Sequence, residues 1–124
     1  MSVTKIHDEG QKLPYPKGKV LGIVDTRAEV DVLVKALGAA GFEKVEALQG
    51  DEGIGLLERV GTFFFSDMEE RVIDRHLEEL KAGHTIIAIT TESDRVDEAV
   101  RVASQNGARR LVHFGPLTVT WHTK

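Results

Sequence analysis

The chain has 124 residues, a length that fits one compact domain, and its 41% hydrophobic and 29% charged residues are typical of a folded globular protein. Its formal net charge of -4, from 16 Lys and Arg against 20 Asp and Glu, argues against a nucleic-acid partner. The absence of cysteine excludes disulfides, thiolate metal sites and a cysteine nucleophile. No apolar run approaches the roughly 20 residues that a membrane span needs, and the first residues lack the apolar core of a signal peptide, so we expect a cytoplasmic protein with no membrane partner.

The sequence predicts an N-terminal arm followed by one domain. Residues 1–18 are expected to be extended or partly disordered, because prolines and glycines interrupt them and their apolar residues show no period. Residues 19–124 are expected to form a single α/β domain.

The first half of this domain, residues 19–50, is predicted to be a strand–helix–strand unit. Val20–Val24 is a short apolar run typical of a buried strand. Thr26 and Glu29 have the spacing of a capping box at the start of a helix, which we expect to end at Gly41. Lys44–Leu48 is the predicted second strand.

The middle of the chain is predicted to contain a loop and one inserted helix. The loop, Gly50–Gly55, is glycine-rich but carries two acidic residues and lacks the lysine of a phosphate-binding loop, so we expect a flexible connector. The inserted helix spans residues 66–82, where Ser66 and Glu69 have capping-box spacing and apolar residues recur at helical intervals.

The second half, residues 84–116, repeats the first. Thr85–Thr90 is the most strand-like segment of the chain, and Ser93 or Asp94 is expected to cap the next helix. Arg110–Phe114 is the returning strand. After it, Leu117–His122 alternates apolar and polar residues, which predicts a fifth strand with one buried face.

These elements predict an α+β fold of the ferredoxin-like type. An alignment of the two halves without a gap pairs Ile23 with Ile89, Val34 with Val100 and Gly41 with Gly107. Two strand–helix–strand units of equal dimensions are expected to form one four-stranded antiparallel sheet with both helices on one face. The other face would then be left largely open, with a C-terminal fifth strand at one edge.

Arginine and histidine side chains are the best candidates for a ligand site. Arg109 and Arg110 form the only basic doublet of the chain, and they could hold an anionic ligand. His113 and His122 are expected to lie near each other on the sheet face opposite the helices. We predict no metal site, no cofactor and no catalytic residue, because no set of ligands or of acid and base groups has a converging spacing.

His84 follows the inserted helix, where an imidazole could bind the last carbonyls of that helix. We expect this capping role for it rather than a role in a ligand site.

Aromatic residues indicate an interface with another copy of the chain. Phe63, Phe64 and Phe65 are consecutive, so one face of a helix or strand cannot bury all three against the same sheet. Trp121 lies on the predicted edge strand. We therefore expect a homodimer that uses these residues.

Several segments together resemble the bacterial general stress protein family, the heat-induced type. The similarity covers most of residues 19–116 and rests on the segments Val20–Asp25, Ala40–Phe42, Lys81–Ile89, Asn106–Leu111 and His113–Gly115. The resemblance implies a small bacterial cytoplasmic α/β protein that is associated with stress and has no assigned catalytic residue. The chain departs from the family in its phenylalanine triplet, its N-terminal arm and its tryptophan-bearing last strand.

Three functions are compatible with these features. The first is a non-enzymatic stress-associated or regulatory domain that acts through oligomer or partner contacts, and the sequence favours it because no group of residues converges into a site. The second is a ligand-sensing module that binds an anionic metabolite near Arg109 or Arg110. The third is an enzyme or haem-type binder of the dimeric α/β-barrel sort that uses His113 or His76.

Overall fold

A computed structural model describes residues 18–60, 67–115 and 119–122 of the chain. Residues 1–17 of the predicted arm, Ser66 and the triplet Phe63–Phe65 lie outside these residues. In chain order the elements are β1 (Lys19–Val24), α2 (Arg27–Ala39), β2 (Val45–Leu48), α3 (Gly50–Val60), α4 (Asp67–Lys81), β3 (Thr85–Thr90), the short 3-10 helix η2 (Ser93–Arg95), α5 (Val96–Gln105), β4 (Arg109–Phe114) and β5 (Val119–Trp121). Among the described residues, no helix combines the length and apolar character needed to cross a bilayer.

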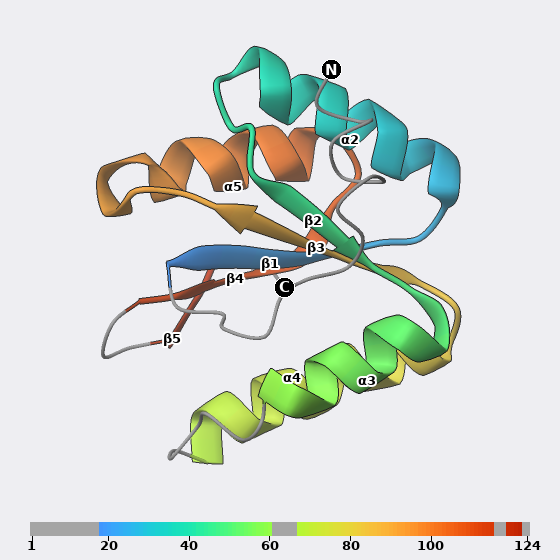
Figure 1. Ribbon diagram of the computed structural model, residues 1–124. Coiled ribbons are helices and arrows are strands. Elements are labelled where there is room, and N and C mark those ends of the chain that lie inside the picture. The colour runs from blue at the N-terminus through green and yellow to red at the C-terminus, as the bar shows by residue number, and fades with distance from the viewer. Residues whose placement is uncertain (1–17, 61–66, 116–118, 123–124) are drawn as a thin grey trace.

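The strands form one open antiparallel sheet in the order β2-β3-β1-β4-β5. With the four α-helices of the described residues, this sheet confirms the α+β class (Figure 1). The sheet has five strands, one more than the four of the predicted ferredoxin-like sheet, because the C-terminal segment adds β5 beside β4. The six-residue β1 is the central strand and is flanked by β3 and β4.

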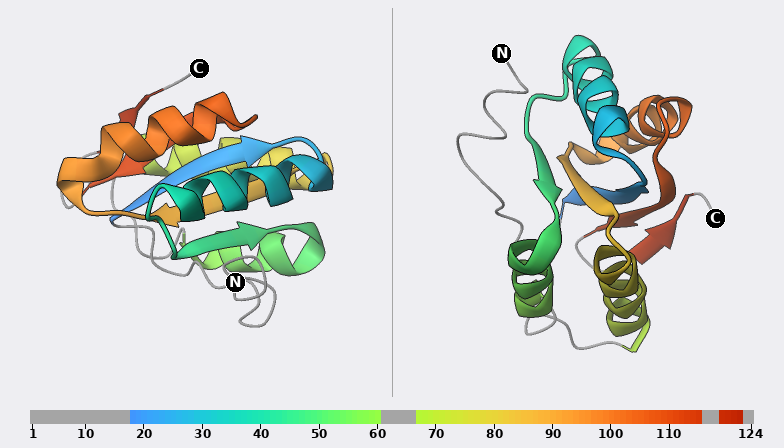
Figure 2. Two further views of the ribbon diagram at one scale, coloured as in Figure 1. Left: turned by 90° about the horizontal axis from the view of Figure 1, so that it is seen from above. Right: turned by 90° about the vertical axis from the view of Figure 1, so that its right-hand side faces the viewer.

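Helices cover both faces of the sheet, which corrects the prediction of one open face (Figures 1 and 2). On one face, α2 and α5 pack on apolar residues such as Val20, Val24 and Leu111. On the other face, α3 and α4 pack on residues such as Leu21 and Phe114. The two faces arise from β1 itself, since successive side chains of a strand point to opposite sides and nearly all of this strand is apolar.

The prediction of a loop over residues 50–55 was wrong, because these residues form the first part of α3, one of the two helices of the second layer. Gly50 begins α3, and Ile54 and Leu57 are spaced three residues apart on the face that packs on the sheet. Leu57 is fully buried. Three glycines in six residues gave this segment the composition of a connector, but burial of its apolar stripe outweighs their low helix propensity.

Local signals at the helix ends were mostly confirmed. The Thr26 side chain accepts from the Glu29 backbone N–H, and the Glu29 carboxylate accepts from the Thr26 backbone N–H. Gly41 has a φ of 97°, the left-handed conformation that ends α2. The cap at Ser93 or Asp94 was wrong: η2 occupies these residues, and no side chain caps η2 or α5.

Candidate functional site

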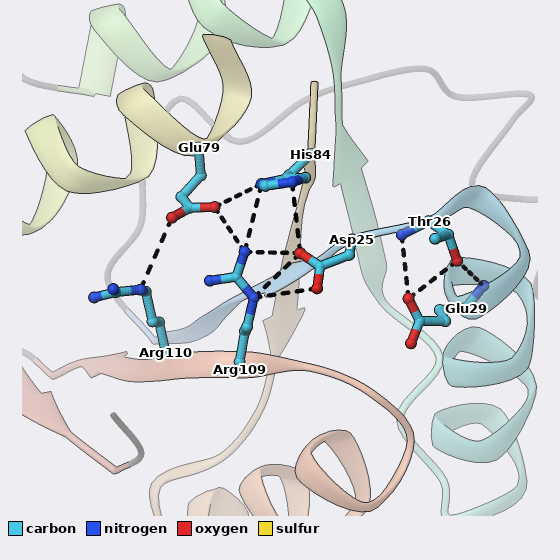
Figure 3. A network of polar contacts seen from close by, with 7 residues as sticks. All are labelled: Asp25, Thr26, Glu29, Glu79, His84, Arg109 and Arg110. Carbon is cyan, nitrogen blue, oxygen red and sulfur yellow. Dashed lines mark hydrogen bonds and ion pairs between the residues drawn. The ribbon is translucent and has the colours of Figure 1, made fainter. Parts of the chain in front are cut away.

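Five charged or polar side chains meet at the end of the sheet where β1 finishes and β3 and β4 begin (Figure 3). Asp25 follows β1, Glu79 lies in the last turns of α4, and His84 precedes β3. Arg109 and Arg110 are the first two residues of β4. We call this group the sheet-end cluster. It joins three parts of the chain that are far apart in the sequence: Asp25 after β1, Glu79 and His84 at the end of α4, and the two arginines of β4.

Arg109 is the centre of the sheet-end cluster. Its Nη2 lies 2.7 Å from Asp25 Oδ1 and 2.8 Å from Glu79 Oε1, and its Nε donates to Asp25 Oδ1 at 3.2 Å. These bonds to Arg109 hold the pKa of Asp25 and the pKa of Glu79 below their usual values. Bonds to the same two carboxylates raise the pKa of Arg109. At neutral pH the three groups are therefore charged, and Arg109 offsets one of the two negative charges.

The imidazole of His84 bonds within the cluster, not to the last carbonyls of α4 as the sequence suggested. Its Nδ1 lies 2.6 Å from Glu79 Oε1, and its Nε2 lies 3.7 Å from Asp25 Oδ1. The backbone N–H of His84, not its imidazole, donates to the Glu79 carbonyl at 3.0 Å. A short Nδ1 contact to a carboxylate fixes the ring orientation and places the second nitrogen toward the other carboxylate.

Arg110 occupies an unusual backbone position. It has a φ of 52°, the only positive value at a non-glycine residue among those described. The pairing of β1 with β4 shifts register here, so that Gly22 faces both Arg110 and Leu111. A Cβ at Gly22 would lie 2.6 Å from Leu111 Cδ2, so a larger residue there would force the buried Leu111 side chain to move. The closest charged contact of the Arg110 side chain is Nε to Glu79 Oε2, at 3.9 Å.

Replacing Arg109 with methionine is expected to destabilise the fold, because Asp25 and Glu79 would lose their shared cation and repel each other. We expect the free energy of unfolding to fall by about 1 to 2 kcal/mol, a modest value for several charge-assisted bonds because all the partners are partly solvated. Urea unfolding measures this change. Arg101→Met is the matched control, because Arg101 is exposed on α5, and a substitution there is expected to change stability by less than about 0.5 kcal/mol. Equal stabilities for the two variants would contradict a stabilising role for the cluster.

The other two predicted ligand residues, His113 and His122, lie close together but on another part of the sheet. Their ring centroids are 6.4 Å apart. His113 pairs with Val20 across β1 and β4 and therefore projects to the face covered by α2 and α5. The prediction that His113 lies on the sheet face opposite the two repeat helices was wrong, because it lies on the same face as these helices, α2 and α5. Partial burial, and then the neighbouring His122, lower the pKa of His113.

His76, on α4, is the one fully buried histidine among the described residues. Its Nδ1 lies 2.8 Å from the Val72 carbonyl oxygen, so Nδ1 carries the proton and donates it. Within the part of the chain that the structure describes, its Nε2 has no hydrogen-bond partner, and its ring stacks on Trp121 with the centroids 6.3 Å apart. Burial lowers the pKa of His76 to about 4. The imidazole is therefore neutral at physiological pH, with an unpaired Nε2 beneath the tryptophan.

Other polar surfaces of the described residues do not bring the predicted site residues together. A groove of about 350 Å³ opens at the opposite end of the sheet, and its lining includes Lys44, Thr91 and Arg95 but none of the four predicted ligand residues. Within residues 18–60, 67–115 and 119–122, no three His, Asp or Glu side chains are grouped so that they could hold a metal ion.

The sequence placed Arg109 and Arg110 in a site but missed their partners. Asp25 was recognised only as the end of a strand, and Glu79 was one of many charges on the inserted helix. The position of Asp25 could have revealed one partner. Asp25 directly follows β1 and Arg109 begins β4, and these two ends meet when the strands are antiparallel neighbours. Comparisons of the chain with protein-family models, with curated proteins and with solved structures found no match.

Proposed function

We propose that this chain is a non-enzymatic regulatory domain of the stress-associated type, which acts through contacts with another copy of itself. The observation that carries this proposal is the edge strand β5, whose Trp121 is 41% exposed. An exposed tryptophan on a strand at the edge of a sheet is typical of a contact surface. The resemblance to general stress proteins adds a bacterial, cytoplasmic setting to this proposal.

The two carboxylates of the sheet-end cluster are poor candidates for general acid–base catalysis. A general acid or base needs a pKa near the working pH, but Asp25 and Glu79 have a lowered pKa and remain ionised there. Arg109 is bonded to both carboxylates. Bonds from Arg109 to Asp25, after β1, and to Glu79, on α4, would hold α4 against the end of the sheet. This is a structural role.

We further propose that the fold is of the ferredoxin-like type, with additions. The order β2-β3-β1-β4, with α2 between β1 and β2 and α5 between β3 and β4, is what two interlocked strand–helix–strand units would produce. In this description α3 and α4 are inserted between the two units, and β5 is appended to the edge.

Light scattering of the full chain at several concentrations tests the proposed function. We expect the mass of a dimer at high concentration and a decrease toward the mass of the monomer on dilution. The single tryptophan reports the same event, since its emission should shift to longer wavelength as dilution exposes it. A monomer at every concentration, with unchanged emission, would rule out the proposal.

Arg110 favours a second candidate function, the sensing of a small anionic ligand. A guanidinium whose closest charged contact is 3.9 Å away keeps donors for a carboxylate or phosphate, and backbone strain is often found where a side chain is placed for binding. Thermal unfolding with added phosphate or citrate tests this function. Stabilisation that disappears in Arg110→Gln but persists in Arg101→Gln would support it, and no stabilisation of the native chain would exclude it for these anions.

Arg110→Gly is expected to stabilise the fold. Glycine adopts a positive φ without the steric cost that a side chain incurs, and this gain exceeds the entropy that glycine loses on folding, so the free energy of unfolding should rise by about 0.5 to 1 kcal/mol. Arg101→Gly, in the middle of α5, should instead lower it by about 1 kcal/mol. Thermal or urea unfolding of both variants gives the signs. Destabilisation of both would show that the Arg110 side chain is needed for stability.

A further inference from the structure

The outer edge of β5 carries backbone groups that point away from the sheet. The His122 N–H donates to the Leu111 carbonyl at 2.9 Å, and the register pairs Thr120 with His113 and Trp121 with Val112. In an antiparallel pair, hydrogen-bonded and non-hydrogen-bonded positions alternate. Thr120 therefore bonds to β4, whereas the N–H and C=O of Val119 and Trp121 point outward. Among the described residues, these outward groups have no backbone partner.

An identical strand fits this edge when the two strands are related by a two-fold axis at Thr120. In that register Trp121 of each copy lies opposite Val119 of the other, so the N–H and C=O of each residue meet the C=O and N–H of its partner. All the outward-pointing groups of the described edge are then paired. A register shifted by one residue would instead place groups already bonded to β4 at the new interface.

The side chains agree with the same register. Trp121 and Val119 project from one face of β5, and pairs of an aromatic with a β-branched residue are among the favourable cross-strand pairs. Thr120 would face Thr120 of the other copy, which is also a favourable pair. Trp121, partly exposed in the single chain, would be covered further while it continues to stack on His76.

The other edge of the sheet does not offer an equivalent pairing. The Thr90 N–H donates to the Lys44 carbonyl, and the β2–β3 register then directs the backbone groups of Val45 and Ala47 outward. A two-fold pairing of β2 with itself would be centred on Glu46. It would place two Glu46 carboxylates, each already paired with Lys19 of its own chain at 2.8 Å, directly opposite each other, where the β5 pairing has a favourable Thr–Thr pair. The charges thus distinguish the two edges and favour β5.

We infer that two copies of the chain join their sheets through antiparallel pairing of β5 with β5, on a two-fold axis at Thr120. This inference rests on the proposed function, and it specifies the surface and the register that the function requires. The partner is a second copy because each side of the pairing supplies the donors, the acceptors and the apolar side chain that the other side needs.

Cysteine crosslinking of the full chain tests the register, since the native sequence contains no cysteine. Residues that face each other at a non-hydrogen-bonded position have Cα atoms about 4.5 Å apart, within the range of a disulfide. Thr120→Cys should therefore form a disulfide-linked dimer under mild oxidation. Ser104→Cys, exposed on α5, is the matched control and should crosslink at least about tenfold more slowly.

A charge variant tests the same surface without oxidation. Thr120→Arg would place like charges at the two-fold axis and should weaken self-association about tenfold or more in light scattering, whereas Ser104→Arg should not. If the native chain dimerises but neither Thr120 variant has its expected effect, the β5 register is wrong and the proposed function survives. If the native chain is monomeric, both fail. A folded Thr120→Cys whose thiol is protected in a monomer would mean that the chain covers its own edge, and this too would overturn the inference.

Discussion

Phe114→Ala is expected to lower the free energy of unfolding by about 3 to 5 kcal/mol, a large part of the stability of a domain of this size. Phe114 is fully buried on β4, on the sheet face that α3 and α4 cover. Truncating this ring leaves a cavity between the sheet and the two helices. Urea unfolding followed by circular dichroism measures the loss.

The control for this prediction is Val32→Ala. Val32 is 56% exposed on α2, so its truncation should change stability by less than about 0.5 kcal/mol. The comparison also tests the second helical layer. On the open face that the sequence suggested, Phe114 would be partly solvated, and its truncation would cost about 1 kcal/mol or less. A small effect would therefore contradict the covering of this face by α3 and α4.

The sequence specified the individual strands and helices better than their layers. Apolar runs such as Val20–Val24 and Thr85–Thr90 are long enough and β-branched enough to identify strands without tertiary information. The α3 segment could not be identified in this way. Its glycines argue for a loop, and only the apolar surface of the sheet, which exists after folding, makes burial of Ile54 and Leu57 favourable.

Only part of the sheet-end cluster could be predicted from the sequence. A basic doublet is visible in a sequence, so Arg109 and Arg110 could be selected before the fold was known. Asp25, Glu79 and His84 acquire their meaning only from the antiparallel pairing of β1 with β4 and from the place where α4 ends. The positive φ of Arg110 has no sequence signal, since non-glycine residues seldom adopt it.

Stability is expected to fall as the pH decreases from about 6.5 toward 4, and His76 is the main cause. Its pKa is about 4 in the folded chain, against an ordinary value of 6.5. Within this window the unfolded chain binds a proton that the folded chain excludes, so stability is complete above the unfolded pKa and is lost as the pH falls. A difference of this size corresponds to about 3 kcal/mol at the acidic end. The lowered pKa values of Asp25 and Glu79 add a further loss at still lower pH, when those carboxylates become protonated.

His76→Leu separates the buried histidine from the other groups. The variant keeps an apolar side chain beneath Trp121 but cannot take up a proton, so its stability should change little between pH 7.5 and pH 5. The native chain should lose about 2 kcal/mol over that range, measured by urea unfolding at each pH. His113→Asn is the matched control: its removal should leave most of the loss in place, because His113 is only partly buried. If His76→Leu lost stability as steeply as the native chain, the imidazole would not be the buried neutral group that its unpaired Nε2 indicates.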